Sequence, residues 1–237
     1  MISTVLFDLD GTLLPMDNDA FTKYYFKLLA ADLVPMGYDP KTLIDAVWAG
    51  TSAMVKNNGS RPNEEAFWEC FGSIVGEKAL ADKEKFMDFY RYRFAGAKAA
   101  CGFNPLVPKL IADLKAKGTP TALATNPIFP EIATLQRIEW AGISADDFKL
   151  YTVYENIGFC KPNLDYYREV CRRLGKEPSE CIMVGNDADE DMIAEELGMQ
   201  VFLITDNLIN RSGKDISQWK HGSFADLCEL LGEWSLI

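Results

Sequence analysis

Hydrophobic residues recur with different periods in different parts of the chain. Residues 2–7, ISTVLF, form a short apolar run that ends in the turn-forming sequence DLDGT. This pattern predicts a buried strand that leads into a tight turn. From about residue 17 to residue 98, apolar residues recur at helical spacing in segments separated by Gly, Pro or Asn-Gly. We expect this part of the chain to be all helical.

Beyond residue 98, predicted helices and strands alternate. A helix at about 106–117 leads to the strand TPTALAT, a helix at about 130–140 leads to KLYTVY, and a helix at about 163–174 leads to CIMVGN. A further helix, EDMIAEELG, leads to the strand QVFLIT. Such alternation is typical of a parallel sheet covered by helices on both faces.

These patterns predict an α/β fold, a doubly wound parallel sheet, with an inserted all-helical cap domain. We expect the core domain to span residues 1–14 and 99–237, and the cap domain to span residues 15–98. The two crossings fall near Pro15 and in the segment 96–105, where Gly and Pro suit hinges.

Composition and charge argue against several classes of protein. Hydrophobic residues make up 48% of the 237 residues, and no run approaches the roughly 18 apolar residues of a membrane span. The N-terminus lacks the basic region of a signal peptide, which indicates the cytoplasm, where the six scattered cysteines are free thiols. The single histidine, His221, lies in WKHGSF, which resembles a polar loop. The net charge of −11 argues against binding to nucleic acid or to an anionic membrane.

Polar residues follow several of the predicted strands. In a doubly wound sheet, ligands bind outside the carboxyl ends of the strands, so these residues are candidates for a functional site. The candidates are Asp8, Asp10, Thr125, Asn126, Lys161, Asn186, Asp187 and Asp191. Together they would bring acids, a hydroxyl group and a lysine to one edge of the sheet.

Each candidate also has an ordinary structural interpretation. Asp8 and Asp10 suit a turn before Gly11, and the acids at 187–191 suit the N-terminus of a helix. Thr125 suits a helix N-cap, and Lys161 suits a solvated loop. The order of all four groups along the chain, each at a strand end, favours the functional interpretation.

This order resembles the four motifs of the haloacid dehalogenase-like (HAD) superfamily. Asp8-Leu9-Asp10-Gly11-Thr12 resembles its first motif in the form common among its phosphatases, and Thr125 resembles the second. Lys161-Pro162 resembles the third motif, and the acidic cluster at 185–191 resembles the fourth. The resemblance spans the whole core and implies a Rossmann-like sheet with a helical cap of the C1 class.

The resemblance also implies a mechanism, that of a Mg²⁺-dependent phosphatase acting on a small phosphorylated metabolite. Asp8 is expected to be the nucleophile that accepts the phosphoryl group, and Asp10 the general acid and base. Thr125, Asn126 and Lys161 would bind phosphate. The metal ligands would be Asp8, the main-chain carbonyl of Asp10, and Asp187, with Asp191 in a supporting role.

Other functions stay open at this point. A phosphomutase of the β-phosphoglucomutase type shares the four motifs and the helical cap. A phospho-accepting receiver domain uses similar residues, but it is about half as long and has no helical insertion, and a catalytically idle relative would not need every motif residue. In the cap, the polar segment 56–61 has two interpretations: a solvated loop, which its composition favours, or a segment that reaches an anionic or sugar-like leaving group. Trp48, Phe67 and Trp68 lie at helical spacing, which favours packing over a substrate-binding role. The substrate and the oligomeric state are not predicted.

Overall fold

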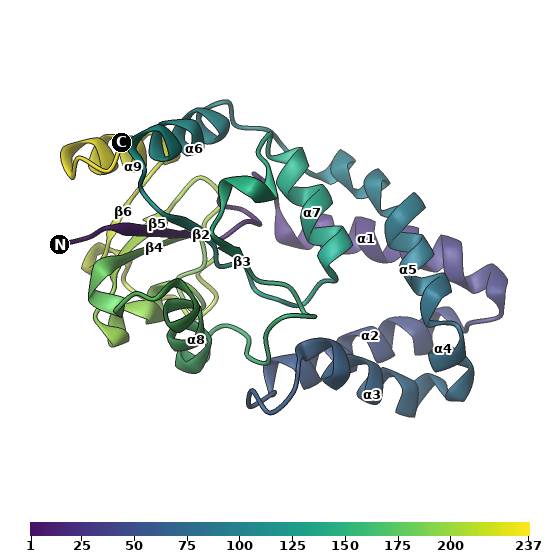
Figure 1. Cartoon of the computed structure of the whole chain (residues 1–237). Helices are drawn as coiled ribbons and strands as arrows, with labels where there is room; N and C mark the ends of the chain where they lie inside the picture. Colours follow the sequence, from purple (N-terminus) through teal and green to yellow (C-terminus); the bar gives the residue numbers. More distant parts are fainter.

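Strand β1 (Thr4–Phe7) lies inside a six-stranded sheet in the computed structural model, which describes residues 1–237. All neighbouring strands are parallel, in the order β3-β2-β1-β4-β5-β6 (Figure 1). The other strands are β2 (Thr121–Leu123), β3 (Leu150–Tyr151), β4 (Cys181–Gly185), β5 (Gln200–Ile204) and β6 (Lys220–Gly222). The expected doubly wound parallel sheet is therefore confirmed.

Helices cover both faces of this sheet because alternate residues of its central strands point to opposite sides. Val5 and Phe7 pack in the same hydrophobic cluster as residues of α6 (Leu106–Lys117), α7 (Glu131–Trp140) and α9 (Phe224–Glu233). Leu6 packs in a second cluster with residues of α8 (Leu164–Leu174). Figure 1 shows α6 and α9 on one side of the sheet and α8 on the other.

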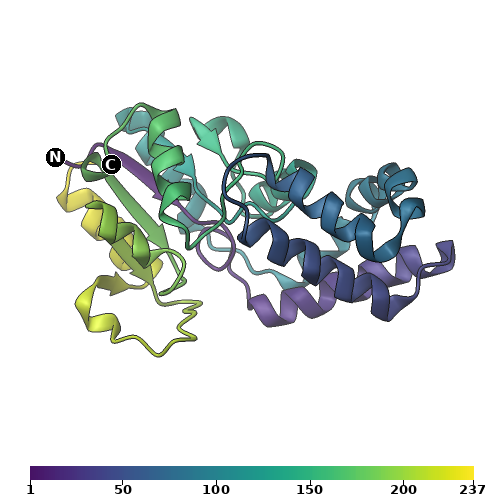
Figure 2. The ribbon, with the colours of Figure 1, turned by 90° about the horizontal axis from the view of Figure 1, so that it is seen from below.

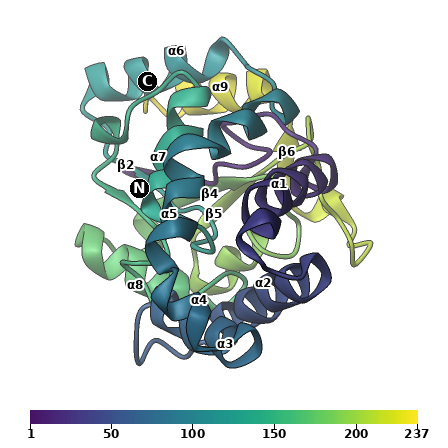
Figure 3. The ribbon, with the colours of Figure 1, turned by 90° about the vertical axis from the view of Figure 1, so that its right-hand side faces the viewer.

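The segment between β1 and β2 is helical up to residue 117, and its first helices stand apart from the sheet. They are α1 (Asn18–Leu33), α2 (Pro40–Val55), α3 (Asn63–Val75), α4 (Glu77–Ala81) and α5 (Lys83–Tyr92). Figure 2 shows them beside the sheet, and Figure 3 shows them in front of its carboxyl edge. No helix has the length and apolar composition to cross a membrane.

The two chain segments that join these helices to the sheet run side by side. Met16 and Cys101 form an isolated antiparallel bridge, and the main-chain N–H of Gly102 donates to the carbonyl oxygen of Pro15 (2.7 Å). Both segments fall where the sequence suggests crossings. The division at residues 14/15 and 98/99 stays a prediction.

Two local predictions were wrong. The segment EDMIAEELG forms a 3₁₀ helix over Met192–Leu197 instead of an α-helix, because Gly198 ends it in the left-handed region within six residues. The segment WKHGSF contains β6 and the N-cap of α9, so His221 lies in a short edge strand and not in a loop. This strand contains only Lys220, His221 and Gly222, a segment too short for alternation of apolar and polar residues to predict a strand.

Candidate active site

Asp8 follows β1 directly, and its main-chain N–H continues the sheet by donating to Val184 (2.9 Å). The side chain is 7% exposed. Next to it, Gly11 has a φ of 87°, and a Cβ at that position would lie 2.3 Å from the side-chain nitrogen of Asn186. The turn thus needs glycine both for its backbone conformation and for space. The hydroxyl group of Thr12 lies 3.3 Å from Asp8 Oδ2 and 3.1 Å from Asn186 Oδ1.

Lys161 joins Asp8 to the acidic loop after β4. Its Nζ lies 2.9 Å from Asp8 Oδ1 and 2.6 Å from Asp191 Oδ1, and its side chain is 1% exposed. Burial lowers the pKa of Lys161, but Asp191 and Asp8 outweigh it and hold this pKa well above its ordinary value. Burial raises the pKa of Asp191 to about 6, against the opposing effect of Lys161. Lys161 and Asp191 are therefore both charged at neutral pH.

The loop after β4 is shaped by Asp187 and Asp191. The main-chain N–H of Asp187 donates to Asp191 Oδ2 (2.9 Å), and Asp187 Oδ1 accepts from Asp189 (2.8 Å) and Glu190 (2.9 Å). A Cβ at Gly185 would lie 2.0 Å from Asp191 Oδ2, so glycine at the end of β4 leaves the space that the Asp191 carboxylate occupies. Asp187 therefore organises the turn and also faces the cavity described below.

Asp10 pairs with a residue that sequence reasoning missed. Arg137 of α7 is 1% exposed and donates from Nη1 to Asp10 Oδ2. Asp10 Oδ1 is buried and has no hydrogen-bond partner. Burial raises the pKa of Asp10; Arg137 opposes this and Asp8 adds to it. The only sequence signal for Arg137 is its position one helical turn after the buried Ala133.

Thr125 and Asn126 follow β2 at the same edge. Thr125 is 2% exposed, and its carbonyl oxygen accepts from Tyr166 (2.9 Å), which fixes the backbone while the side chain lines the cavity. Asn126 Nδ2 donates to Glu190 Oε2 (2.9 Å), and its Oδ1 accepts from the main-chain N–H of Lys161 (3.3 Å). Glu190 was given no role from sequence, and burial raises its pKa to about 7. Thr125 is no helix cap, since α7 starts at Glu131.

The oxygen atoms at this edge suit a hard cation. Asp187 Oδ2 has no protein partner, and Asp8 lies at the end of the neighbouring strand, since β1 pairs with β4. Carboxylate and carbonyl oxygens are the ligands that Mg²⁺ prefers. No three acidic, histidine or cysteine side chains gather closely enough to form a metal site by themselves. The expected Mg²⁺ ligands are only two carboxylates, of Asp8 and Asp187, and the main-chain carbonyl of Asp10, so they do not require a group of three such side chains. This ligand set stays a prediction.

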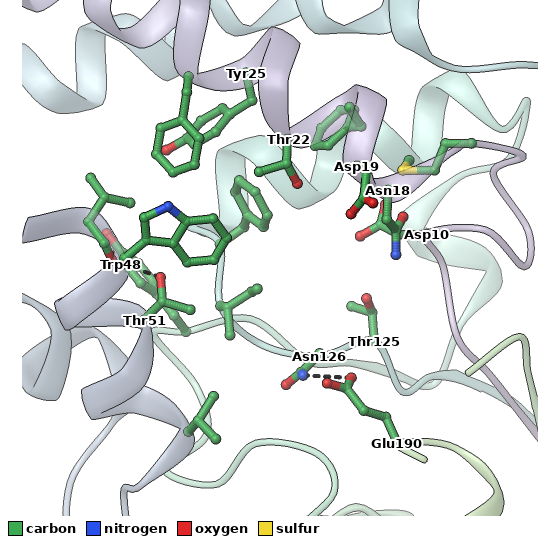
Figure 4. Close-up of a pocket in the computed structure, with 18 of the residues that line it drawn as sticks. Asp10, Asn18, Asp19, Thr22, Tyr25, Trp48, Thr51, Thr125, Asn126 and Glu190 are labelled. Atoms are coloured by element: carbon green, nitrogen blue, oxygen red, sulfur yellow. Dashed lines mark hydrogen bonds between the residues drawn. The ribbon is translucent and has the colours of Figure 1, made fainter. Parts of the chain in front are cut away.

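A cavity of about 630 Å³ separates this edge from the helical segment. Asp8, Asp10, Thr125, Asp187 and Asp191 line one side of it. Figure 4 shows Trp48 and Thr51 of α2 across the open space from Asp10 and Thr125. The cavity therefore offers space for a small ligand between the strand ends and the helices.

The aromatic residues of the cap both pack and line the cavity. Trp68 belongs to the main hydrophobic cluster and Phe67 packs against it, as their spacing favours, and both line the cavity together with Trp48. The polar segment 56–61 does not reach the cavity. Its Asn57 is buried and donates to Arg61 O (2.9 Å), and Arg61 pairs with Glu69. Apart from Asn57, the residues of this segment are exposed and belong to no helix or strand, so it is a solvated loop between α2 and α3, as expected.

Comparisons with known proteins agree with this arrangement. The family model described as haloacid dehalogenase-like hydrolase matches residues 2–197. A glyceraldehyde 3-phosphate phosphatase of Methanothermobacter thermautotrophicus is 26% identical over 226 residues, which cover 92% of this chain and 95% of that protein. The crystal structure of a 2-haloacid dehalogenase from Pseudomonas syringae pv. tomato matches with a TM-score of 0.63 and 19% identity, over 99% of this chain and 100% of that one. A putative HAD-hydrolase of Bacillus subtilis bound to magnesium has a TM-score of 0.60 and 17% identity, over 98% and 99% of the two chains.

Proposed function

Because this chain belongs to the haloacid dehalogenase-like hydrolase family, we propose that it is a Mg²⁺-dependent phosphatase that hydrolyses a small phosphate monoester through an aspartyl-phosphate intermediate. The observation that carries the proposal is the buried contact of Lys161 with both Asp8 and Asp191, at the end of the central strand. A lysine so placed stabilises negative charge on the nucleophile and on the transferring phosphoryl group. The phosphatase names of curated relatives support it.

In the first step, a carboxylate oxygen of Asp8 attacks phosphorus and forms the acyl phosphate bond. The bond from phosphorus to the leaving oxygen breaks, and Asp10 gives its proton to that oxygen. In the second step, Asp10 takes a proton from water, the resulting hydroxide attacks phosphorus, and the Asp8 carboxylate leaves. The unpaired Oδ1 of Asp10 is the oxygen suited to this proton transfer, because Arg137 occupies Oδ2.

Asp8, the carbonyl oxygen of Asp10, and Asp187 would hold Mg²⁺, which offsets the repulsion between these acids and a phosphate dianion. Thr125, Asn126 and Lys161 would bind the phosphoryl oxygens; Thr125 and Asn126 line the cavity, and Lys161 contacts Asp8, which supports these roles. Asp191 would support the site by holding Lys161 and the loop at Asp187.

Asp10 also favours phosphatase activity over the dehalogenase activity named for the structurally similar protein. Displacement of a halide needs no proton, whereas an alkoxide leaving group does. A low sequence identity of 19% to that protein shows a shared fold alone.

The test is a phosphate-release assay with Mg²⁺ on a panel of sugar phosphates, phosphoglycolate and an aryl phosphate. We expect release that Asp8→Asn abolishes, that Asp10→Asn lowers by about a hundredfold or more, and that EDTA abolishes. Asp187→Asn should raise the Mg²⁺ concentration needed for half activity. Asp189→Asn is the matched control, since Asp189 contacts Ser212 and Lys214 instead of the cavity.

Full activity of Asp8→Asn, or undiminished activity in EDTA, would contradict the mechanism. Conversion of a sugar phosphate to its isomer without net release of phosphate would indicate the phosphomutase alternative.

A further inference from the structure

The wall that the helical segment contributes to the cavity is aromatic. Side chains from α1, α2, α3 and α5 form it, including Tyr25, Trp48, Phe67 and Tyr90. Aromatic side chains supply large contact areas and favour partners that are themselves apolar and flat. This wall lies opposite the acidic edge of the sheet (Figure 4).

Most polar atoms of the aromatic wall already have protein partners. The hydroxyl groups of Tyr25 and Tyr90 are 2.8 Å apart, and Trp68 Nε1 donates to the hydroxyl group of Tyr154 (3.4 Å). The hydroxyl group of Thr51 donates to the main chain of its own helix (2.9 Å). The other polar side chains that the helices contribute, Asn18, Asp19, Thr22 and Lys23, come from the start of α1, where Figure 4 shows Asn18 and Asp19 beside Asp10. Hydroxyl groups that lie against the aromatic wall itself would therefore lose their hydrogen bonds to water, at a cost of the order of 1–3 kcal/mol for each unpaired group.

Trp48 is the member of the wall that is open to a ligand. Its side chain is 53% exposed although it lines the cavity. Its ring packs against Phe26 at a centroid distance of 5.4 Å, and its indole N–H has no partner in the protein. A large apolar group left in contact with water inside a cavity is a favourable contact for an apolar ligand.

Charge disfavours an anionic leaving group. Only two cations, Lys23 and Arg211, line the cavity, and both are exposed at its surface. The buried cations Lys161 and Arg137 already pair with the acids of the site. A second carboxylate or phosphate on the substrate would therefore have no buried counter-charge among the helices.

From these observations we propose that the substrate is a phosphate monoester of a bulky, uncharged aromatic alcohol whose ring lies against Trp48. The inference rests on the proposed function and adds the class of substrate. The volume of about 630 Å³ is in the range of cavities that bury ligands of this size, and it far exceeds what a two-carbon acid fills.

The test compares three primary alkyl phosphates, so that the reactivity of the leaving oxygen is similar: 2-(2-naphthyl)ethyl phosphate, phosphoglycolate and phosphocholine. We expect kcat/KM to be at least about tenfold higher for the naphthyl ester. Trp48→Ala should lower that value by about tenfold or more, chiefly through KM, and should lower the value for phosphoglycolate much less. Trp48→Phe should retain most of the preference. The alcohol 2-(2-naphthyl)ethanol should inhibit competitively, and less so in Trp48→Ala.

Tyr92→Ala is the matched control, because Tyr92 is 74% exposed on α5 and does not line the cavity. A higher kcat/KM for phosphoglycolate or phosphocholine would overturn the inference, and so would an equal loss for all three esters in Trp48→Ala. In either case, phosphate release that depends on Asp8 would leave the proposed function standing. Absence of such release from every ester in both panels would contradict the proposed function itself, and the inference with it.

Discussion

Arg137 lies in surroundings where an unpaired cation would be costly. Its guanidinium group donates to Asp10, to Thr134 Oγ1 (3.1 Å) and to the carbonyl oxygen of Ala133 (3.3 Å), and it lies 4.4 Å from the ring of Phe129. Moving a charged group out of water costs several kcal/mol, which only close partners of this kind offset. Arg137 therefore holds the Asp10 carboxylate in one orientation.

We expect Arg137→Met to lower the free energy of unfolding by about 3 kcal/mol, because Asp10 is left buried without its counter-charge. The activity should also fall, chiefly in kcat, since Asp10 loses its fixed orientation. Urea denaturation measures the first effect. The control is Lys109→Met, which removes an exposed ion pair with Asp113 and should cost less than about 1 kcal/mol. Equal losses in the two variants would contradict a structural role of the buried pair.

At the scale of elements, α7 is anchored at its first residue by an acid from another loop. Both carboxylate oxygens of Glu155 lie 2.9 Å from the main-chain nitrogen of Glu131, and Pro130 at the N-cap offers no side-chain acceptor. An anion at a helix N-terminus is favourable, yet burial outweighs this and raises the pKa of Glu155 to about 7. The helix that carries Arg137 is thus coupled to a group that titrates near neutral pH.

This coupling predicts a pH dependence of stability. Because the folded-state pKa of Glu155 lies above its ordinary value of 4.5, its stabilising effect is complete below that value and is lost as pH rises through about 7. In Glu155→Gln, the free energy of unfolding should therefore fall less between pH 5 and 8, by the order of 1 kcal/mol given its partial exposure. Urea denaturation at several pH values measures it. A profile that follows the control Glu139→Gln, an exposed site on α7, would contradict the prediction.

Helices were easier to predict than their details. The helical segments of the cap were expected, and side-chain oxygens of Asp17 and Asp39 cap α1 and α2. Such caps are local signals, because the capping residue directly precedes the helix that it caps. In contrast, Asp191, the residue before the 3₁₀ helix at Met192–Leu197, gives that helix no side-chain cap and bonds instead to Lys161, thirty positions away. Such a partner leaves no trace in local periodicity.

At the scale of the whole molecule, the helical segment contacts the rest of the chain at places other than its two connections, and one of these is the loop before Lys161. The main-chain N–H groups of Gly59 and Asn63 donate to the carbonyl oxygens of Gly158 and Ile157 (2.9 Å each). The side chain of Asn63, 0% exposed, donates to the carbonyl oxygen of Phe159 (3.2 Å). This contact immediately precedes Lys161 in the sequence, so it links the helices to the position of that lysine.

We expect Asn63→Ala to lower the free energy of unfolding by about 1–3 kcal/mol, since buried carbonyl groups lose their donor. Its effect should exceed that of Asn58→Ala, an exposed residue of the same loop whose side chain accepts only from Ser60. Thermal or urea unfolding of the two variants provides the comparison. If both variants unfold like the wild type, the side chain of Asn63 does not hold this contact together.

The sequence by itself determined the order of the elements, the parallel sheet and the positions of Asp8, Asp10, Thr125 and Asp187 just after strand ends, with Lys161 at the end of the loop after β3. These features follow from local periods and turn chemistry, and parallel strands bring their carboxyl ends to one edge in any such fold. Only the tertiary structure decided that Arg137 pairs with Asp10, that Asn63 holds the loop before Lys161, and that Trp48 faces the cavity. Each of these features depends on contacts between residues that are distant in sequence. A local pattern predicts that a helix has an apolar face, but it does not predict which residues of the rest of the chain that helix will contact.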